Sequence, residues 1–255
     1  MLLNYQIQTH ESADLTPMVF IHGLFGSLSN LGMLARHFSK QRTVIQLDVR
    51  NHGLSDHSSE MNYAFMATDI LETLSGLKIK KFIIIGHSMG GKIAMKLADL
   101  APDQVEKMIV LDITPIQYHE NHHAEIFKAL FKVQQLQPNS RNEAAQMMRD
   151  YIQEEMVIQF LLKSFNKGQW LFNVQALFDS YEEIIAWEKI EKNEIPVLFL
   201  RGTNSSYISR PEHFDAIHEQ FGQAKIEVIE NAGHWLHGEK TADVLTHMQS
   251  FIDEK

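Results

Sequence analysis

The segment Gly86–Gly90, which reads GHSMG, constrains the fold of this chain more than any other segment. It follows the apolar run Phe82–Ile85, which has the composition of a buried strand, and it precedes the helical pattern Lys92–Leu100. In the order strand, G-x-S-x-G, helix, this motif forms a sharp turn that lifts the serine hydroxyl clear of the sheet. The sequence therefore predicts that Ser88 is a nucleophile at the end of a strand.

The same residues also match most of a nucleotide-binding loop. Gly86–Lys92 reads G-x-x-x-x-G-K, and Asp112 follows an apolar run as a magnesium-holding aspartate would. Such a loop needs Ser or Thr directly after the lysine to bind the metal. Ile93 occupies that position and has no oxygen to offer. The nucleophile is therefore the favoured interpretation.

Short apolar runs alternate with helical patterns over most of the chain. Nearly continuous apolar runs are expected where a parallel sheet is covered on both faces, so this alternation predicts an α/β fold with a doubly wound, mostly parallel sheet. Strands are expected at Met18–Ile21, Val44–Asp48, Phe82–Ile85, Met108–Leu111, Val197–Leu200 and Ile226–Ile229. Helices are expected near Leu28–Phe38, Phe65–Leu77, Lys92–Leu100, Glu212–Phe221 and Ala242–Ile252.

The alternation stops between residues 116 and 194. No run there has the pattern of a strand, and helices are expected near His123–Leu136, Asn142–Tyr151 and Val174–Trp187. This segment is less than a third of the chain but holds 11 of its 24 aromatic residues. The rings either attach the segment to the core or line an apolar cleft. We therefore expect a core of residues 1–115 and 195–255 with a helical cap inserted at residues 116–194.

A serine hydroxyl becomes an effective nucleophile when a base accepts its proton. His234, in the loop after the last expected strand, is the predicted base, and His237 is a less well placed candidate. The base needs a neighbouring carboxylate to hold its tautomer and to stabilise its charged form. The loop at residues 201–206 contains no acidic residue. Asp112, which ends the strand after the serine motif, is therefore the predicted acid, with Asn204 as the alternative orienting group.

The oxyanion that forms during acyl transfer needs hydrogen-bond donors. The Met89 N–H, directly after the serine, is one predicted donor. The loop after the first buried strand is expected to supply the other, from the N–H of Leu24 in preference to that of Phe25, because glycines nearby allow the required turn. Phe25, His87 and Trp235 are the side chains predicted to contact a substrate.

Composition limits the partners and the cofactors. The net charge is −9 and there is no basic run, which argues against a nucleic-acid partner. The chain has no cysteine, which excludes disulfides, a thiol nucleophile and cysteine-bound metals and is compatible with a cytoplasmic location. No apolar run approaches the ~20 residues of a membrane span. His119, His122 and His123 lack acidic partners at ligand spacing, so neither a metal nor another cofactor is expected.

Four segments together resemble the α/β-hydrolase family over nearly the whole chain. They are HGLFG at 22–26, DVRNHGLS at 48–55, GHSMGG at 86–91 and GHW at 233–235. Within that family, RNHG at 50–53, LDITP at 111–115 and GTNS at 202–205 resemble the YbfF-type esterases. The resemblance implies a helical cap over the site and hydrolysis of carboxylic esters or thioesters, including acyl-CoA. It also implies an acid after the sixth strand of the fold, here Asp112.

The favoured hypothesis is therefore a serine hydrolase that acts on a small-molecule ester or thioester through an acyl-enzyme on Ser88. One alternative is a carbon–carbon bond lyase or synthase with the same triad, which arginines lining the cap would favour for anionic substrates. The expected cap offers only Arg141 and Arg149. Another alternative is a ligand receptor that uses the hydrolase fold without catalysis. The oligomeric state and the acyl chain length stay open.

Overall fold

The computed structural model describes residues 1–11, 15–119 and 123–254. One sheet contains seven strands in the spatial order β1-β3-β2-β4-β5-β8-β9, all paired in parallel except β1 with β3. The strands are β1 (Tyr5–Gln8), β2 (Met18–Ile21), β3 (Val44–Leu47), β4 (Phe82–His87), β5 (Val105–Leu111), β8 (Val197–Gly202) and β9 (Ala224–Ile229). The expected mostly parallel sheet is thus confirmed.

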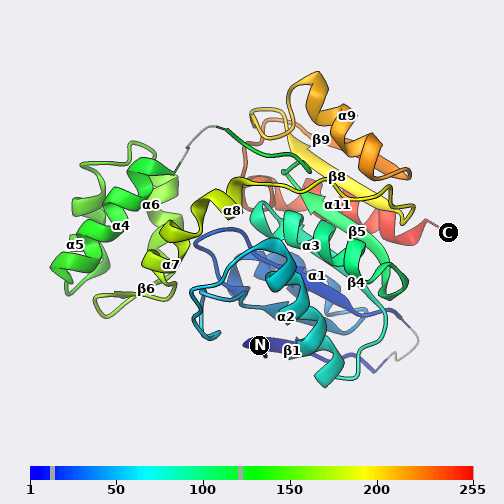
Figure 1. Ribbon diagram of the computed structural model, residues 1–255, viewed down its shortest axis with the longest axis horizontal. Coiled ribbons are helices and arrows are strands. Elements are labelled where there is room, and N and C mark those ends of the chain that lie inside the picture. Colours follow the sequence, from blue (N-terminus) through cyan, green and yellow to red (C-terminus); the bar gives the residue numbers. More distant parts are fainter. Residues whose placement is uncertain (12–14, 120–122, 255) are drawn as a thin grey trace.

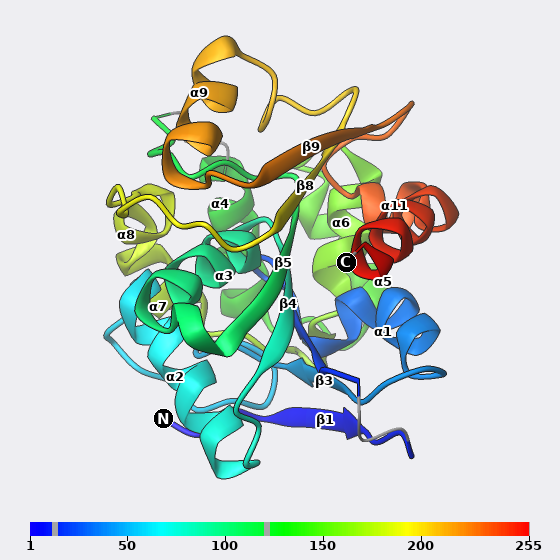
Figure 2. The same cartoon turned by 90° about the vertical axis from the view of Figure 1, so that its right-hand side faces the viewer.

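Alternate residues of the central strands enter two separate cores, because successive side chains of a strand point to opposite faces. Val19 and Ile21 of β2 belong to one core, whereas Met18 and Phe20 belong to the other. The helices around the sheet are α1 (Gly32–Phe38), α2 (Tyr63–Gly76), α3 (Met89–Leu100), α9 (Pro211–Gln220), α10 (Leu236–Glu239) and α11 (Thr241–Asp253). Helices α2 and α3 cover the first face, and α1 and α11 cover the second (Figure 2).

Five helices and a small hairpin connect β5 to β8. They are α4 (Ala124–Leu136), α5 (Arg141–Met148), α6 (Glu155–Leu162), β6 (Phe165–Asn166), β7 (Gln169–Trp170), α7 (Val174–Asp179) and α8 (Tyr181–Ile185). Helices α4 to α7 gather at one end of the molecule, beside the sheet and its covering helices (Figure 1).

The hairpin corrects the expectation that the 116–194 segment contains no strand. Its strands have two residues each, too short to show the alternation by which a strand is recognised in a sequence. Lys167 and Gly168 form the turn with positive φ angles of 48° and 82°, as a tight hairpin turn requires.

Most aromatic side chains of this segment pack within it or against the core. Phe127 and Phe172 contact the ring of Phe25 at centroid distances of 5.4 and 5.3 Å, and Trp170 stacks on Phe172 at 5.2 Å. Phe160 differs, because together with the core residue Trp235, whose ring lies 5.8 Å away, it lines a cleft. Both roles considered for these rings therefore occur.

Candidate active site

The turn between β4 and α3 holds Ser88 in a strained backbone conformation. Its φ and ψ angles are 54° and −123°, which non-glycine residues rarely adopt. The two glycines of the motif allow the close approach that this turn requires. A Cβ atom on Gly86 would lie 2.1 Å from the Gly90 carbonyl oxygen, and one on Gly90 would lie 2.4 Å from the Ile21 carbonyl oxygen. The strand–turn–helix context predicted for the serine is present.

The structure brings together the three side chains proposed from the sequence as nucleophile, base and acid. His234 Nε2 lies 3.0 Å from Ser88 Oγ, and His234 Nδ1 lies 2.7 Å from Asp112 Oδ2. A carboxylate only accepts hydrogen bonds, so Nδ1 is the donor to Asp112 and Nε2 is left to accept the serine proton. Asn204, the alternative orienting residue, lies in the same cleft, but the bond to the imidazole comes from Asp112.

Asp112 is completely buried and is held by three donors. Its Oδ1 accepts from the Gly202 N–H at 3.1 Å, and its Oδ2 accepts from the Ser205 hydroxyl as well as from His234. A buried carboxylate is costly unless it is hydrogen-bonded. The role of Ser205 was not predicted, although the residue ends the GTNS segment at 202–205. The loop at residues 201–206 has no acidic residue of its own, but it holds the carboxylate of Asp112, which directly follows β5.

Two backbone N–H groups are free to face a developing oxyanion. Among the described residues, neither the Leu24 nor the Met89 N–H donates to a protein acceptor. Leu24 and Ser88 both line the same cleft. The Phe25 N–H, the alternative donor, is engaged with His52 Nε2 at 3.1 Å. The geometry therefore leaves Leu24 and Met89 as the available pair.

Two buried histidines brace the loop that carries Leu24. His22 Nε2 accepts from the Val49 N–H at 3.1 Å, and its Nδ1 lies 2.8 Å from the Gly23 carbonyl oxygen. His52 accepts from the Phe25 N–H and donates from Nδ1 to the Arg50 carbonyl oxygen at 2.9 Å. Burial lowers the pKa of His22, and it lowers the pKa of His52 to about 3. Both are thus neutral and serve as supports.

The other histidines around His234 are also neutral. Burial lowers the pKa of His87 well below its usual range and lowers that of His237 to about 3. His87 Nε2 donates to the His234 carbonyl oxygen at 2.9 Å, which fixes the backbone of the proposed base. His237 packs against the His87 ring at 4.4 Å.

A cleft of about 630 Å³ lies over Ser88 and His234. All three side chains predicted to contact a substrate, Phe25, His87 and Trp235, line it. Tyr207, which the sequence analysis missed, also lines it and stacks on the His234 imidazole at 4.1 Å. The 116–194 segment contributes His123, Glu125, Ile126, Tyr151, Ile152, Gln153, Glu154, Val157, Phe160 and Leu161. Of the aromatic rings in this segment, Tyr151 and Phe160 are the ones that line the cleft among the described residues.

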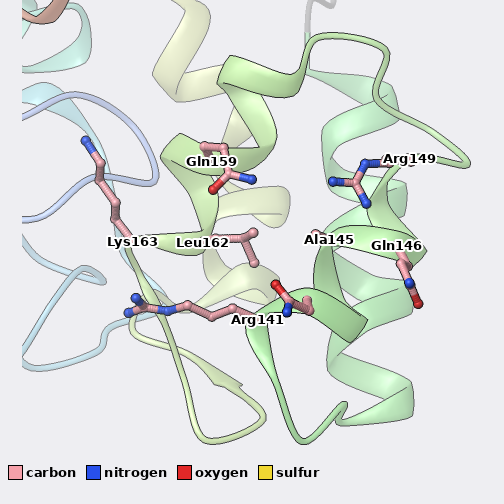
Figure 3. A pocket seen from close by; sticks show the side chains of 8 residues that line it. Arg141, Ala145, Gln146, Arg149, Gln159, Leu162 and Lys163 are labelled. Atoms are coloured by element: carbon pink, nitrogen blue, oxygen red, sulfur yellow. The ribbon is translucent and has the colours of Figure 1, made fainter.

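A second hollow of about 510 Å³ lies between α5 and α6 (Figure 3). Arg141 and Arg149 line it, and neither is among the described residues that line the Ser88 cleft. Arg141 Nε donates to the Phe165 carbonyl oxygen at 3.2 Å, and Arg149 forms two hydrogen bonds with Glu155. The arginines that would favour a lyase are therefore used in the structure of the segment itself.

Two further observations concern metal ions and membranes. Within residues 1–11, 15–119 and 123–254, no three His, Asp or Glu side chains are grouped as a metal site would require. His122, part of the histidine cluster considered above, lies outside these ranges. None of the helices in the described ranges has the length and apolar character needed to cross a membrane.

Comparison with known proteins gives a consistent result. Residues 16–146 match the α/β hydrolase fold family. Over its full length the chain is 46% identical to all of the esterase YbfF of Escherichia coli K12. It is 38% identical to the sn-1-specific diacylglycerol lipase ABHD11 of Danio rerio, over 94% of this chain and 79% of that one.

A solved structure agrees with this grouping. A marine microorganism esterase superposes with a TM-score of 0.92 at 31% identity, over 98% of this chain and 99% of that one. The sheet order, the serine turn and these full-length similarities lead to one assignment. The chain belongs to the α/β-hydrolase family, among the esterases that resemble YbfF.

Proposed function

We propose that this protein hydrolyses carboxylic esters and thioesters through an acyl-enzyme on Ser88, with His234 as base, Asp112 as its orienting acid and the N–H groups of Leu24 and Met89 as the oxyanion hole. The continuous hydrogen-bonded series from Ser88 through His234 to Asp112 carries the proposal. The family membership supports it, because known relatives over the full length are named esterases.

In the first half of the reaction, Ser88 Oγ attacks the carbonyl carbon while its proton passes to His234 Nε2. The negative charge on the carbonyl oxygen is stabilised by the two N–H groups, and Asp112 stabilises the imidazolium. When the C–O or C–S bond breaks, the imidazolium gives its proton to the leaving alcohol or thiol. In the second half, His234 takes a proton from water while the water oxygen attacks the acyl carbon. The imidazolium then returns this proton to Ser88 Oγ as the bond between Oγ and the acyl carbon breaks, which releases the carboxylic acid and restores the enzyme.

We further propose that residues 116–194 act as a cap domain on the core formed by residues 1–115 and 195–255. Phe160 of α6 and Tyr151 of the connection between α5 and α6 support this division, because they line the cleft beside Ser88 from the inserted segment. A cytoplasmic location, compatible with the absence of cysteine, stays a prediction.

The test is a Ser88→Ala variant assayed with p-nitrophenyl acetate and butyrate. Loss of a triad member costs ~10⁴–10⁶ in kcat, and labelling by a fluorophosphonate probe should disappear. Ser206→Ala is the matched control, because Ser206 is an exposed serine on the same cleft outside the triad. Full turnover in a well-folded, uncontaminated Ser88→Ala preparation would contradict the mechanism.

A further inference from the structure

Lys92 is a buried cation close to the nucleophile that the proposed mechanism does not use. It lies one helical turn after Ser88 in α3 and is only 1% exposed. Its Nζ donates to the carbonyl oxygens of Ile185 at 3.2 Å and Ala186 at 3.0 Å, which end α8. The sequence placed this lysine in an incomplete nucleotide-binding motif, and the structure gives it a different environment.

Aromatic rings surround the ammonium group. The ring centroids of Tyr118, Tyr63 and Trp187 lie 4.8, 5.6 and 5.9 Å from Nζ, within the range of cation–π contacts. Burial lowers the pKa of Lys92 to about 7. Two carbonyl dipoles and three ring faces thus fix the side chain in place.

This fixed side chain lines an inner pocket of about 50 Å³ that is distinct from the outer cleft of about 630 Å³. Ser88, Leu24, His123 and Tyr207 line both spaces, so the reacting carbon would sit where they meet. The remaining lining of the inner pocket is Tyr63, Met89, Lys92, Ile113, Tyr118, Tyr181, Ile184 and Ile185.

The position of His234 decides which part of the substrate enters which space. The imidazolium must reach the leaving oxygen or sulfur to give it a proton. His234 lines the outer cleft and is not among the described residues that line the inner pocket. The leaving group therefore points into the outer cleft, and the acyl chain points into the inner pocket beside Met89.

The sizes of the two spaces then define the substrate. A group the size of a water molecule needs roughly 10–15 Å³ of cavity volume. The inner pocket of about 50 Å³ therefore holds about three to five non-hydrogen atoms. Building on the proposed esterase activity, we propose that the preferred substrates combine a short acyl group with a bulky alcohol or thiol. Lys92 is the residue that limits the acyl chain, because its tethered side chain cannot move aside as a free lysine would.

Two isomeric esters test this directly. Octyl acetate and ethyl octanoate have the same atoms and apolar surface, but they place the long chain on opposite sides of the ester bond. Hydrolysis is measured by pH-stat titration of the acid that is released. The value of kcat/KM should be at least tenfold higher for octyl acetate than for ethyl octanoate. A preference for ethyl octanoate, or equal values, would overturn the inference and leave the esterase assignment intact.

Variants separate the two spaces. Lys92→Ala should raise kcat/KM for ethyl octanoate relative to octyl acetate at least tenfold. Lys92→Met, which keeps the length of the side chain but loses its two hydrogen bonds to the carbonyl oxygens of Ile185 and Ala186, should raise the same ratio by less. Phe160→Ala, in the outer cleft, should change kcat/KM for octyl acetate. It should leave kcat/KM for ethyl octanoate, which carries the long acyl chain, unchanged. Ile184→Ala enlarges the same inner pocket and replaces Lys92→Ala if that variant does not fold.

The result can be told apart from a failure of the proposed function. If wild-type protein hydrolysed neither isomer nor p-nitrophenyl acetate, and a fluorophosphonate did not label Ser88, the esterase proposal itself would fail. If Ser88 were labelled and esters were hydrolysed while Lys92→Ala and Ile184→Ala left the acyl preference unchanged, only the assignment of the inner pocket would be wrong.

Discussion

Asp112 combines a positive φ angle with a completely buried carboxylate, and both need support from neighbouring residues. Its φ angle of 54° turns the chain sharply at the end of β5, and its carboxylate has no exposed surface. The loop after β8 compensates the burial through the Gly202 N–H and the Ser205 hydroxyl. The carboxylate is thus fixed before the imidazolium forms, which is what stabilisation of a transition-state charge requires.

Replacing this carboxylate tests the assignment of the acid. Asp112→Asn should lower kcat by about 10²–10⁴, because an amide neither stabilises the imidazolium nor enforces the required tautomer. Asn204→Ala, in an exposed residue of the same cleft, should change kcat by far less. The measurement is steady-state ester hydrolysis by both variants, with circular dichroism to verify folding. The reverse order of effects would make Asn204 the orienting residue.

At this scale the sequence predicts the residues that belong to motifs. Ser88, His234 and Asp112 are identified by their position after strands and by the order in which they occur, and the structure brings them into hydrogen-bond contact. The roles of Ser205, which ends the GTNS segment, and of Tyr207 could not be found in this way. A hydroxyl that holds a carboxylate and a ring stacked on an imidazole act through proximity in space, and neither follows a pattern along the chain.

Among the elements, the turn from β4 into α3 is the one most restricted by its backbone. The Cβ positions on Gly86 and Gly90 are blocked by carbonyl groups, which cannot rotate away as a side chain can. The requirement for glycine therefore comes from the contact between β2, β4 and α3, and the hydroxyl of Ser88 depends on the same contact for its position.

Gly90→Ala should destabilise the fold by about 1–3 kcal/mol or more, because its methyl group would overlap the Ile21 carbonyl. Gly76→Ala is the matched control. Gly76 also lies in a helix, but a Cβ there meets no atom within 4 Å, so alanine should be neutral or stabilise by up to ~1 kcal/mol. Urea unfolding of both variants gives the comparison. Equal stabilities would show that the turn relaxes around the added methyl group.

The core elements were predictable because their apolar runs are nearly continuous and bounded by polar residues. The six expected strands lie where the apolar runs predict them, with ends that differ by up to three residues. Helix α6 was missed because six of the eight residues Glu155–Leu162 are apolar, which obscures its helical stripe in the sequence. In the structure Val157, Ile158, Leu161 and Leu162 form the buried face, whereas Met156 is exposed and Phe160 lines the cleft.

Across the whole molecule, four histidines are buried without charge close to the site. These are His22, His52, His87 and His237. Their folded-state pKa values lie below the ordinary value of about 6.5. As the pH falls below that value, the unfolded chain takes up protons that the folded chain does not. The contribution of these neutral histidines to stability is therefore fully present above about pH 6.5 and decreases as the pH falls below that value, down to about pH 3 for His52 and His237.

His237 allows a direct test of this dependence, because its pKa is lowered to about 3 and its Nδ1 has no partner among the described residues. Each such histidine contributes a slope of about 1.4 kcal/mol per pH unit within the window. The free energy of unfolding should therefore fall less between pH 6 and pH 5 in His237→Phe than in the wild-type protein, by about 1.4 kcal/mol. Urea unfolding at the two pH values measures it, and parallel losses in both proteins would contradict the assignment.

The turn that carries Ser88 and the two substrate spaces are built from different parts of the chain, and this difference affects how such an enzyme acquires new substrates. The turn that carries Ser88 is fixed by backbone against backbone at Gly86 and Gly90, whereas the inner pocket and the outer cleft are lined by side chains such as Ile184 and Phe160. Side chains that line these spaces can be replaced one at a time without moving the turn that carries Ser88. Laboratory evolution of this chain towards a new ester should therefore collect its substitutions in the two linings and leave both glycines untouched.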